Sequence, residues 1–225
     1  MINKKNVVHF QNENTTEVAI EKIKNRVKHH QLRIFLLGIF TIVALMIIYF
    51  IIKQRTSKEE VAQKAMLHAV HCFEQGLYDE ALQGDQSQMG FIQVTKNYPR
   101  TKSANMSYFY AGTIYMNNRD FDSAITFLEK FNSSEPVIQN QVWVLMGDSF
   151  SEKKNYAKAA EYYMKAANNK ANKISTPLFL IKAAIVYEVM ENYSKALQCY
   201  KRISDEYPTT EYFGDACKQI ARLTN

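Results

Sequence analysis

The feature that most limits the possible folds of this chain is a pattern that recurs three times after residue 100. Each copy carries a small residue between apolar or aromatic residues at helical spacing, and the small residues Gly112, Gly147 and Ala184 lie 35 and 37 residues apart. A period of this length is typical of solenoids, in which each repeat is one supersecondary unit. Because the 225 residues include only 7 Gly and 4 Pro, long helices are favoured over a turn-rich β-sandwich or barrel. The sequence therefore predicts an all-α solenoid.

The residue types indicate that each repeat is a hairpin of two helices. We expect the small residue of the first helix to let the second helix approach closely, and aromatic residues to fill the gaps between hairpins. The matching positions on the second helices are alanines: Ala124, Ala159 and Ala196. The turns at residues 118–120, 154–155 and 191–192 are each followed at once by an aromatic residue.

This arrangement resembles the tetratricopeptide repeat, whose period is about 34 residues. The resemblance covers residues 58–223 and implies repeats at residues 101–136, 137–173 and 174–208. We interpret residues 58–99 as a degenerate first repeat with an insertion, because residues 77–82 resemble the start of a second helix and Gly84 and Gly90 then interrupt the pattern. Residues 209–225 are expected to form a capping helix, which open-ended solenoids require.

A second strong feature is the apolar run from Ile34 to Ile52, nineteen residues with no charged side chain. A helix of this length spans roughly 28 Å, close to the hydrocarbon thickness of a bilayer. Arg33 lies on one side of the run, and Lys53 and Arg55 lie on the other. The sequence predicts a transmembrane helix over residues 32–53, with these cations at its flanks and the lipid bilayer as a partner.

We expect this helix to be an uncleaved anchor, because no small-residue cleavage site follows it and its apolar core is long for a signal peptide. Basic residues are slightly more frequent on its N-terminal side. This favours residues 1–31 as a cytoplasmic tail with a basic juxtamembrane helix. The C-terminal domain is then expected in the periplasm, anchored to the inner membrane.

The distribution of charge argues against nucleic-acid binding. The net charge is +6, and residues 1–55 contain nine Lys and Arg against three Glu, which accounts for all of it. The remaining 170 residues carry 19 basic and 19 acidic side chains. A nucleic-acid-binding domain needs a basic face of its own, so no nucleic-acid partner is predicted.

The architecture also resembles membrane-anchored tetratricopeptide proteins of the bacterial envelope, such as the ancillary subunit of the Sec translocon. The residues that carry this similarity are the insertion, Ala81 to Asp85 with Gly90 and Phe91, and the following Tyr98-Pro99. The resemblance implies a non-enzymatic role in association with the translocon and periplasmic chaperones, acting on newly exported proteins.

In tetratricopeptide folds the first helices line a concave groove. The resemblance places an apolar groove with one acidic side chain there, and its predicted partner-binding residues are Met106, Phe109, Met116, Val144, Asp148, Ile181 and Ile185. Such a surface suits apolar segments or helices of other proteins. Three alternatives remain: the insertion fills the groove, the terminal helix fills it, or two copies dimerise through it.

No motif indicates an enzyme, a cofactor, a metal or a small-molecule substrate. His68 and His71 lie one turn apart on a predicted helix but have no convincing third ligand. Phosphate loops, nucleophile elbows and metalloprotease motifs are not found in the sequence. Cys199 and Cys217 are expected to be small buried apolar side chains, and a disulfide between them in an oxidising compartment is the alternative.

Two hypotheses for the function therefore remain. The first is a membrane-tethered interaction module, a scaffold or chaperone-like subunit, with a cytosolic placement of its domain as a variant. The second is a structural subunit of a fixed assembly or self-oligomer that binds no transient client.

Overall fold

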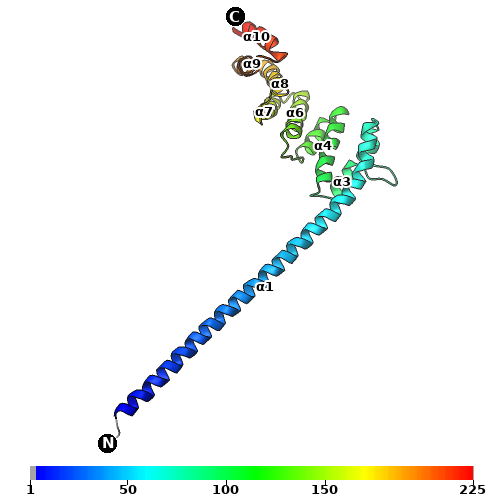
Figure 1. Ribbon diagram of the computed structural model, residues 1–225. Helices are drawn as coiled ribbons and strands as arrows, with labels where there is room; N and C mark the ends of the chain where they lie inside the picture. Colours follow the sequence, from blue (N-terminus) through cyan, green and yellow to red (C-terminus); the bar gives the residue numbers. More distant parts are fainter. Residues whose placement is uncertain (1–3, 225) are drawn as a thin grey trace. The chain divides into compact units, whose positions relative to one another are not determined.

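The computed structural model describes the backbone of residues 4–224 and the side chains of residues 35–224. The chain divides into two compact units, Met1–Ser57 and Lys58–Asn225. Helix α1 (Lys4–Glu74) contributes to both units, and the shorter helices α2 to α10 follow it in the second (Figure 1). Residues 4–224 contain no β-strand, only an isolated bridge between Gly84 and Met89. The predicted all-α class is confirmed.

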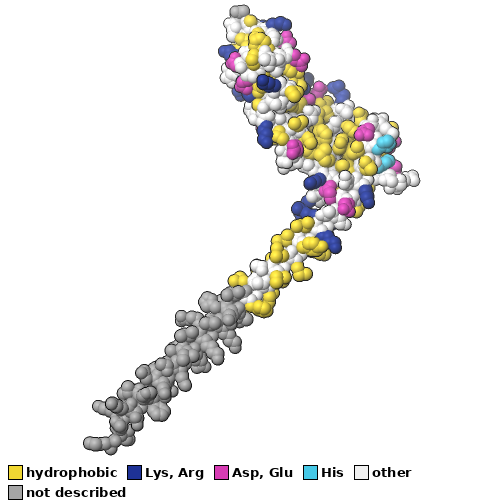
Figure 2. All heavy atoms as spheres, viewed as in Figure 1, with side chains coloured by type: hydrophobic (Ala, Val, Ile, Leu, Met, Phe, Trp, Pro, Cys, Tyr) yellow, Lys and Arg dark blue, Asp and Glu magenta, His cyan; other side chains and the backbone are white. Residues whose placement is uncertain are grey.

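In the N-terminal unit, the described part of α1 is apolar and exposed (Figure 2). The described residues contain one helix that is long and apolar enough to cross a membrane, Phe35–Glu74. Its most apolar stretch of 18 residues has a mean hydropathy of 2.9. A membrane span and a signal sequence share these properties. Lys53 and Arg55 are exposed on the C-terminal side of the apolar residues. The side chain of Arg33 and the predicted juxtamembrane basic side chains lie outside the described residues.

The C-terminal unit is built from successive helical hairpins. These are α4 (Lys102–Asn117) with α5 (Phe121–Leu128), α6 (Pro136–Glu152) with α7 (Tyr156–Asn168), and α8 (Thr176–Val189) with α9 (Tyr193–Glu206). Two short helices precede them, α2 (Tyr78–Gln83) and α3 (Phe91–Asn97), and α10 (Tyr212–Thr224) packs on α9. This is the helical-hairpin solenoid that the repeat pattern predicts.

Small residues bring the two helices of each hairpin together, as the sequence predicts. A Cβ atom on Gly112 would lie 2.6 Å from Leu128 of α5, and one on Gly147 would lie 2.6 Å from the ring of Tyr163 in α7. Ala184 of α8 is fully buried. The alanines at the matching positions of the second helices are also fully buried: Ala124, Ala159 and Ala196.

The turn inside each hairpin has the same backbone conformation but a different residue. Arg119, Lys154 and Glu191 have φ values of 61°, 58° and 57°, in the left-handed region that L residues seldom adopt. The next residue caps the second helix, since the side chains of Asp120, Asn155 and Asn192 accept a hydrogen bond from a backbone N–H three residues ahead. Gly76, after α1, has a φ of 76°.

In two of the repeats, an asparagine of the first helix forms hydrogen bonds with the chain that follows the second helix. The side chain of Asn105, at the start of α4, donates to the carbonyl of Asn132 and accepts from its backbone N–H at 2.8 and 3.1 Å. Asn140, at the start of α6, donates to the carbonyl of Asn169 at 3.1 Å and accepts from its side chain at 2.8 Å. Each bond set joins the beginning of a first helix to the chain just after its partner helix.

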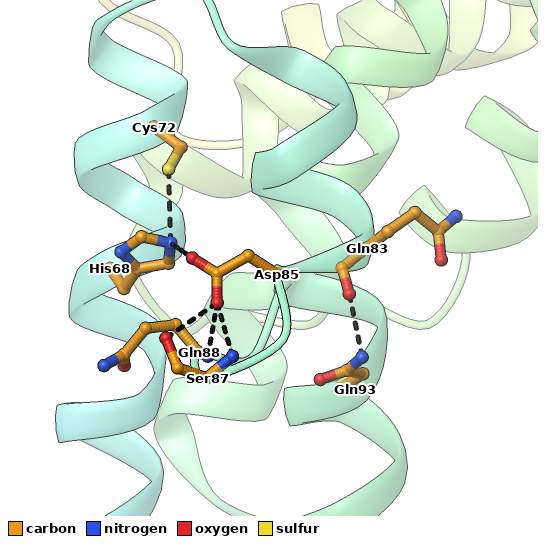
Figure 3. Close-up of polar contacts among 7 residues, drawn as sticks. All are labelled: His68, Cys72, Gln83, Asp85, Ser87, Gln88 and Gln93. Atoms are coloured by element: carbon orange, nitrogen blue, oxygen red, sulfur yellow. Dashed lines mark hydrogen bonds and ion pairs between the residues drawn. The ribbon is translucent and has the colours of Figure 1, made fainter.

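The segment Gly84–Gly90 separates α2 from α3 (Figure 3). Cβ atoms at Gly84 and Gly90 would lie 2.3 Å from backbone atoms of the same segment, so only glycine fits at either position. Asp85 Oδ1 accepts from the backbone N–H groups of Ser87 and Gln88, both at 2.7 Å. Its other oxygen lies 3.5 Å from Nε2 of His68 on α1. The segment is thereby held as a tight loop against α1.

One carboxylate joins the start of the C-terminal unit to the N-terminus of α4. Glu59 of α1 accepts hydrogen bonds from the backbone N–H groups of Lys102 and Ser103, at 2.6 and 2.9 Å. The hydroxyl of Ser103 donates to the same carboxylate at 2.7 Å. These are the unsatisfied N–H groups at the N-terminus of α4, and an anion is the partner that they prefer.

Candidate partner-binding groove

A cavity of about 400 Å³ lies between α6 and α8, with one side chain from α4 and one from α7. It brings together Met116, Asp148 and Ile185, three of the residues that the sequence predicts in a groove. The other lining residues are Ser151, Glu152, Tyr163, Lys182 and Val186. Apolar and charged side chains therefore meet in one place, on the face formed by the first helices of the hairpins.

The charge of Asp148 in this groove is balanced within the protein. Asp148 Oδ1 accepts hydrogen bonds from the Tyr163 hydroxyl at 2.6 Å and from the Lys182 ammonium at 2.8 Å. The Lys182 nitrogen also lies 5.6 Å from the centre of the Tyr163 ring. Burial, together with the hydrogen bond to Asp148, raises the pKa of Tyr163, so this hydroxyl stays a donor. The three side chains link α6, α7 and α8.

Beside this polar group, α8 presents an apolar face to solvent. Leu178, Ile185 and Val189 are 38%, 52% and 54% exposed. The positions are seven and four residues apart, so the side chains lie along one side of the helix. Large aliphatic side chains exposed along one side of a helix are a candidate protein contact.

The remaining predicted groove residues are less accessible. Met106, Phe109 and Ile181 are half-buried and pack against the main hydrophobic core. Val144 is 5% exposed and belongs to that core. The ring of Phe109 lies 5.8 Å from that of Phe131. Substitutions at these four positions would disturb core packing as well as any contact made by the groove.

Two of the alternatives place a part of the chain inside the groove, either the insertion or the terminal helix. The Gly84–Gly90 loop lies against α1 through Asp85, and α10 packs on α9. Arg222 of α10 is paired with Glu188 at the end of α8. Ile185 nevertheless remains 52% exposed, so neither segment covers this part of the groove.

The sequence interpretation missed Lys182 and Tyr163. Lys182 lies three residues before Ile185, so helical spacing alone places it on the same side of α8. Tyr163 lies on a second helix, and its hydroxyl reaches the groove past Gly147, where no side chain intervenes.

Other reactive side chains lie apart from the groove. His68 Nε2 is 3.5 Å from Cys72 Sγ, and His71 Nε2 is 3.0 Å from the side-chain nitrogen of Gln75. The described residues contain no group of three His, Cys, Asp or Glu side chains placed to hold a metal ion. All three cysteines are free. Cys199 is buried as predicted, and this burial raises its pKa to about 11. Cys217 is exposed, so the prediction that it is buried is wrong.

Comparisons with known proteins identify the repeats. A family model described as "Tetratricopeptide repeat" matches residues 107–137 and 141–173, and a second model with the same description matches residues 180–210. The chain thus contains tetratricopeptide repeats, which make it a protein–protein interaction scaffold by class.

Fifteen chains of solved structures are similar to this chain. One of them, "Crystal structure of MamA protein", has a TM-score of 0.54 and 18% sequence identity, and the match covers 73% of this chain and 87% of that one. At this identity the similarity concerns the fold. No curated protein sequence matches the chain.

Proposed function

We propose that this protein is a membrane-tethered scaffold whose groove binds apolar segments of other proteins, in a translocon-associated or chaperone-like role for exported proteins. The observation that carries the proposal is the exposed aliphatic face of α8 beside the α6–α8 cavity. The exposed apolar residues of α1 support tethering to a bilayer.

Charge supports an apolar ligand over an acidic one. Lys182, the one cation among the residues lining the cavity, is already paired with Asp148. An acidic peptide would have to displace Asp148 and leave its carboxylate without the ammonium, which is costly in a partly buried site. An apolar segment instead buries the α8 face and leaves the ion pair intact.

Changing Ile185 to Asp should weaken client binding by tenfold or more, since it places a charge that would be desolvated at the centre of the apolar face. The measurement is photocrosslinking to unfolded exported proteins by full-length protein in nanodiscs, with the photoreactive residue at 178. Ile174→Asp is the matched control, because Ile174 is 87% exposed and lies in the connection before α8. Equal crosslinking by both variants, or a stable homo-oligomer that ignores clients, would contradict the proposal.

The proposed topology places residues 1–31 in the cytoplasm and the repeats in the periplasm of an inner-membrane protein. Cys217 is exposed, whereas Cys72 and Cys199 are buried. A membrane-impermeant maleimide added to cells with a permeabilised outer membrane is therefore expected to label wild-type protein and to leave Cys217→Ser unlabelled. Labelling only after the inner membrane is lysed would place the domain in the cytosol.

We also propose that residues 58–99 form a first repeat with an insertion. Residues 209–225 are proposed to act as the capping helix at the C-terminal end of the solenoid. Gly76 supports the first part, because its left-handed conformation matches that of Arg119, Lys154 and Glu191. The N–H group of the following residue, Leu77, donates to the carbonyl of Cys72 at 2.9 Å. The equivalent bond from Asn155 to Phe150 is 2.8 Å.

A further inference from the structure

A second cavity, of about 460 Å³, lies apart from the groove, between the α5–α6 connection, α6 and α7. Its apolar lining includes three aromatic residues: Phe131, Trp143 and Tyr162. Phe131 is buried, and Trp143 and Tyr162 are half-buried and pack against the main core. An aromatic guest would contact these side chains, and contacts between aromatic rings add to the stabilisation from apolar burial.

The rim of this cavity carries two cations, Lys165 and Lys170, and one acid, Glu129. The Lys165 nitrogen lies 4.6 Å from the centre of the Trp143 ring and 5.7 Å from that of Tyr162. In the part of the chain whose side chains are described, neither lysine belongs to an ion pair. The cavity thus combines three aromatic lining residues with two ammonium groups that form no ion pair among the described side chains.

The rim is held in place without a ligand. Gln139 Oε1 accepts from the backbone N–H of Ser133 at 2.8 Å, and Asn105 is bonded to Asn132 in the same connection. On the opposite side, Asn169 is bonded to Asn140. Because both edges are fixed by hydrogen bonds, little ordering would be needed on binding.

We propose that this cavity is a binding site for a small aromatic carboxylate. The ring enters between Trp143, Tyr162 and Phe131, and the carboxylate pairs with Lys165 at the rim, assisted by Lys170. Lys165 then exchanges a cation–π contact for a charge-assisted hydrogen bond, which is the stronger interaction. The site is separate from the groove and does not depend on the proposed function.

The test uses the fluorescence of Trp143, which is the single tryptophan of the chain and lines the cavity. Full-length protein in detergent is titrated with 3-phenylpropanoate, with its neutral analogue 3-phenylpropanamide, and with octanoate. We expect a saturable change of emission with 3-phenylpropanoate, at an affinity at least tenfold higher than for the amide and for octanoate. Equal binding of the amide would overturn the role of the carboxylate, and equal or tighter binding of octanoate would overturn the aromatic assignment.

Two variants test whether the ligand carboxylate pairs with Lys165. Lys165→Gln should lower the affinity for 3-phenylpropanoate about tenfold, whereas Lys158→Gln should leave it unchanged. Lys158 is the matched control because it also lies on α7 and also covers an aromatic ring, that of Phe150 at 4.9 Å, but does not line the cavity. Equal affinities for both variants, or no saturable signal in the wild type, would overturn the proposal. Ile185→Asp should leave this titration unchanged, so the two sites are tested separately.

Discussion

Gly147→Ala is expected to destabilise the C-terminal unit by about 1–3 kcal/mol, although alanine is intrinsically better than glycine in a helix by about 1 kcal/mol. The new Cβ would lie 2.6 Å from the Tyr163 ring. This ring cannot move aside easily, because it is buried and its hydroxyl donates to Asp148. Either α6 and α7 must separate or the hydrogen bond in the groove must break. Urea unfolding followed by circular dichroism of the full-length protein measures the loss.

Gly214→Ala provides the control, since Gly214 is also helical but a Cβ there meets no atom within 4 Å. That variant should gain a few tenths to about 1 kcal/mol from helix propensity. If both substitutions stabilise the protein, the result would contradict the close contact between α6 and α7 at Gly147.

Glu59→Ala is expected to cost about 2 kcal/mol at pH 7, because it removes a charged acceptor of three hydrogen bonds at the start of α4. Although burial pushes the pKa of Glu59 upward, the hydrogen bonds from Ser103 and Lys102 hold it below its ordinary value of 4.5. A carboxyl group with a lowered folded-state pKa stabilises the protein fully above its unfolded-state pKa and loses this effect as the pH falls through the folded-state pKa. The difference between wild type and variant should therefore be constant near neutrality and shrink below about pH 4.5.

Glu60→Ala is the matched control, because Glu60 is exposed and forms no hydrogen bond or ion pair among the described side chains. Its unfolding free energy should stay close to that of the wild type at every pH. A Glu59→Ala deficit that persists undiminished at pH 3 would mean that packing, and not the charged carboxylate, makes the contribution.

The fold follows from the sequence because its determinants are periodic and local. Small residues recur along the chain at Gly112, Gly147 and Ala184. At each of them the second helix of the same hairpin packs closely against the first helix. The left-handed turn residues were harder to recognise. Arg119, Lys154 and Glu191 share a backbone conformation that their chemistry does not suggest, and only Gly76 carries the usual residue type.

The groove was only partly predictable, because burial within it depends on contacts between repeats. Met116, Asp148 and Ile185 line one cavity as expected, but no periodic rule distinguishes them from Val144, which the core covers. The pairing of Asp148 with Lys182 joins residues 34 positions apart. The position of a residue within its own repeat predicts which face it lies on. It does not show that the charge of Asp148 is neutralised by a lysine of the next repeat.

The asparagine bonds have a consequence for how such a chain can change its length. Asn105 and Asn140 lie 35 residues apart, and each bond set closes a repeat on itself instead of joining it to its neighbour. A recombination event between the two asparagine codons would remove or duplicate one repeat and leave every copy with its own bonds. The asparagine bonds themselves would therefore not oppose the gain or loss of a repeat during evolution.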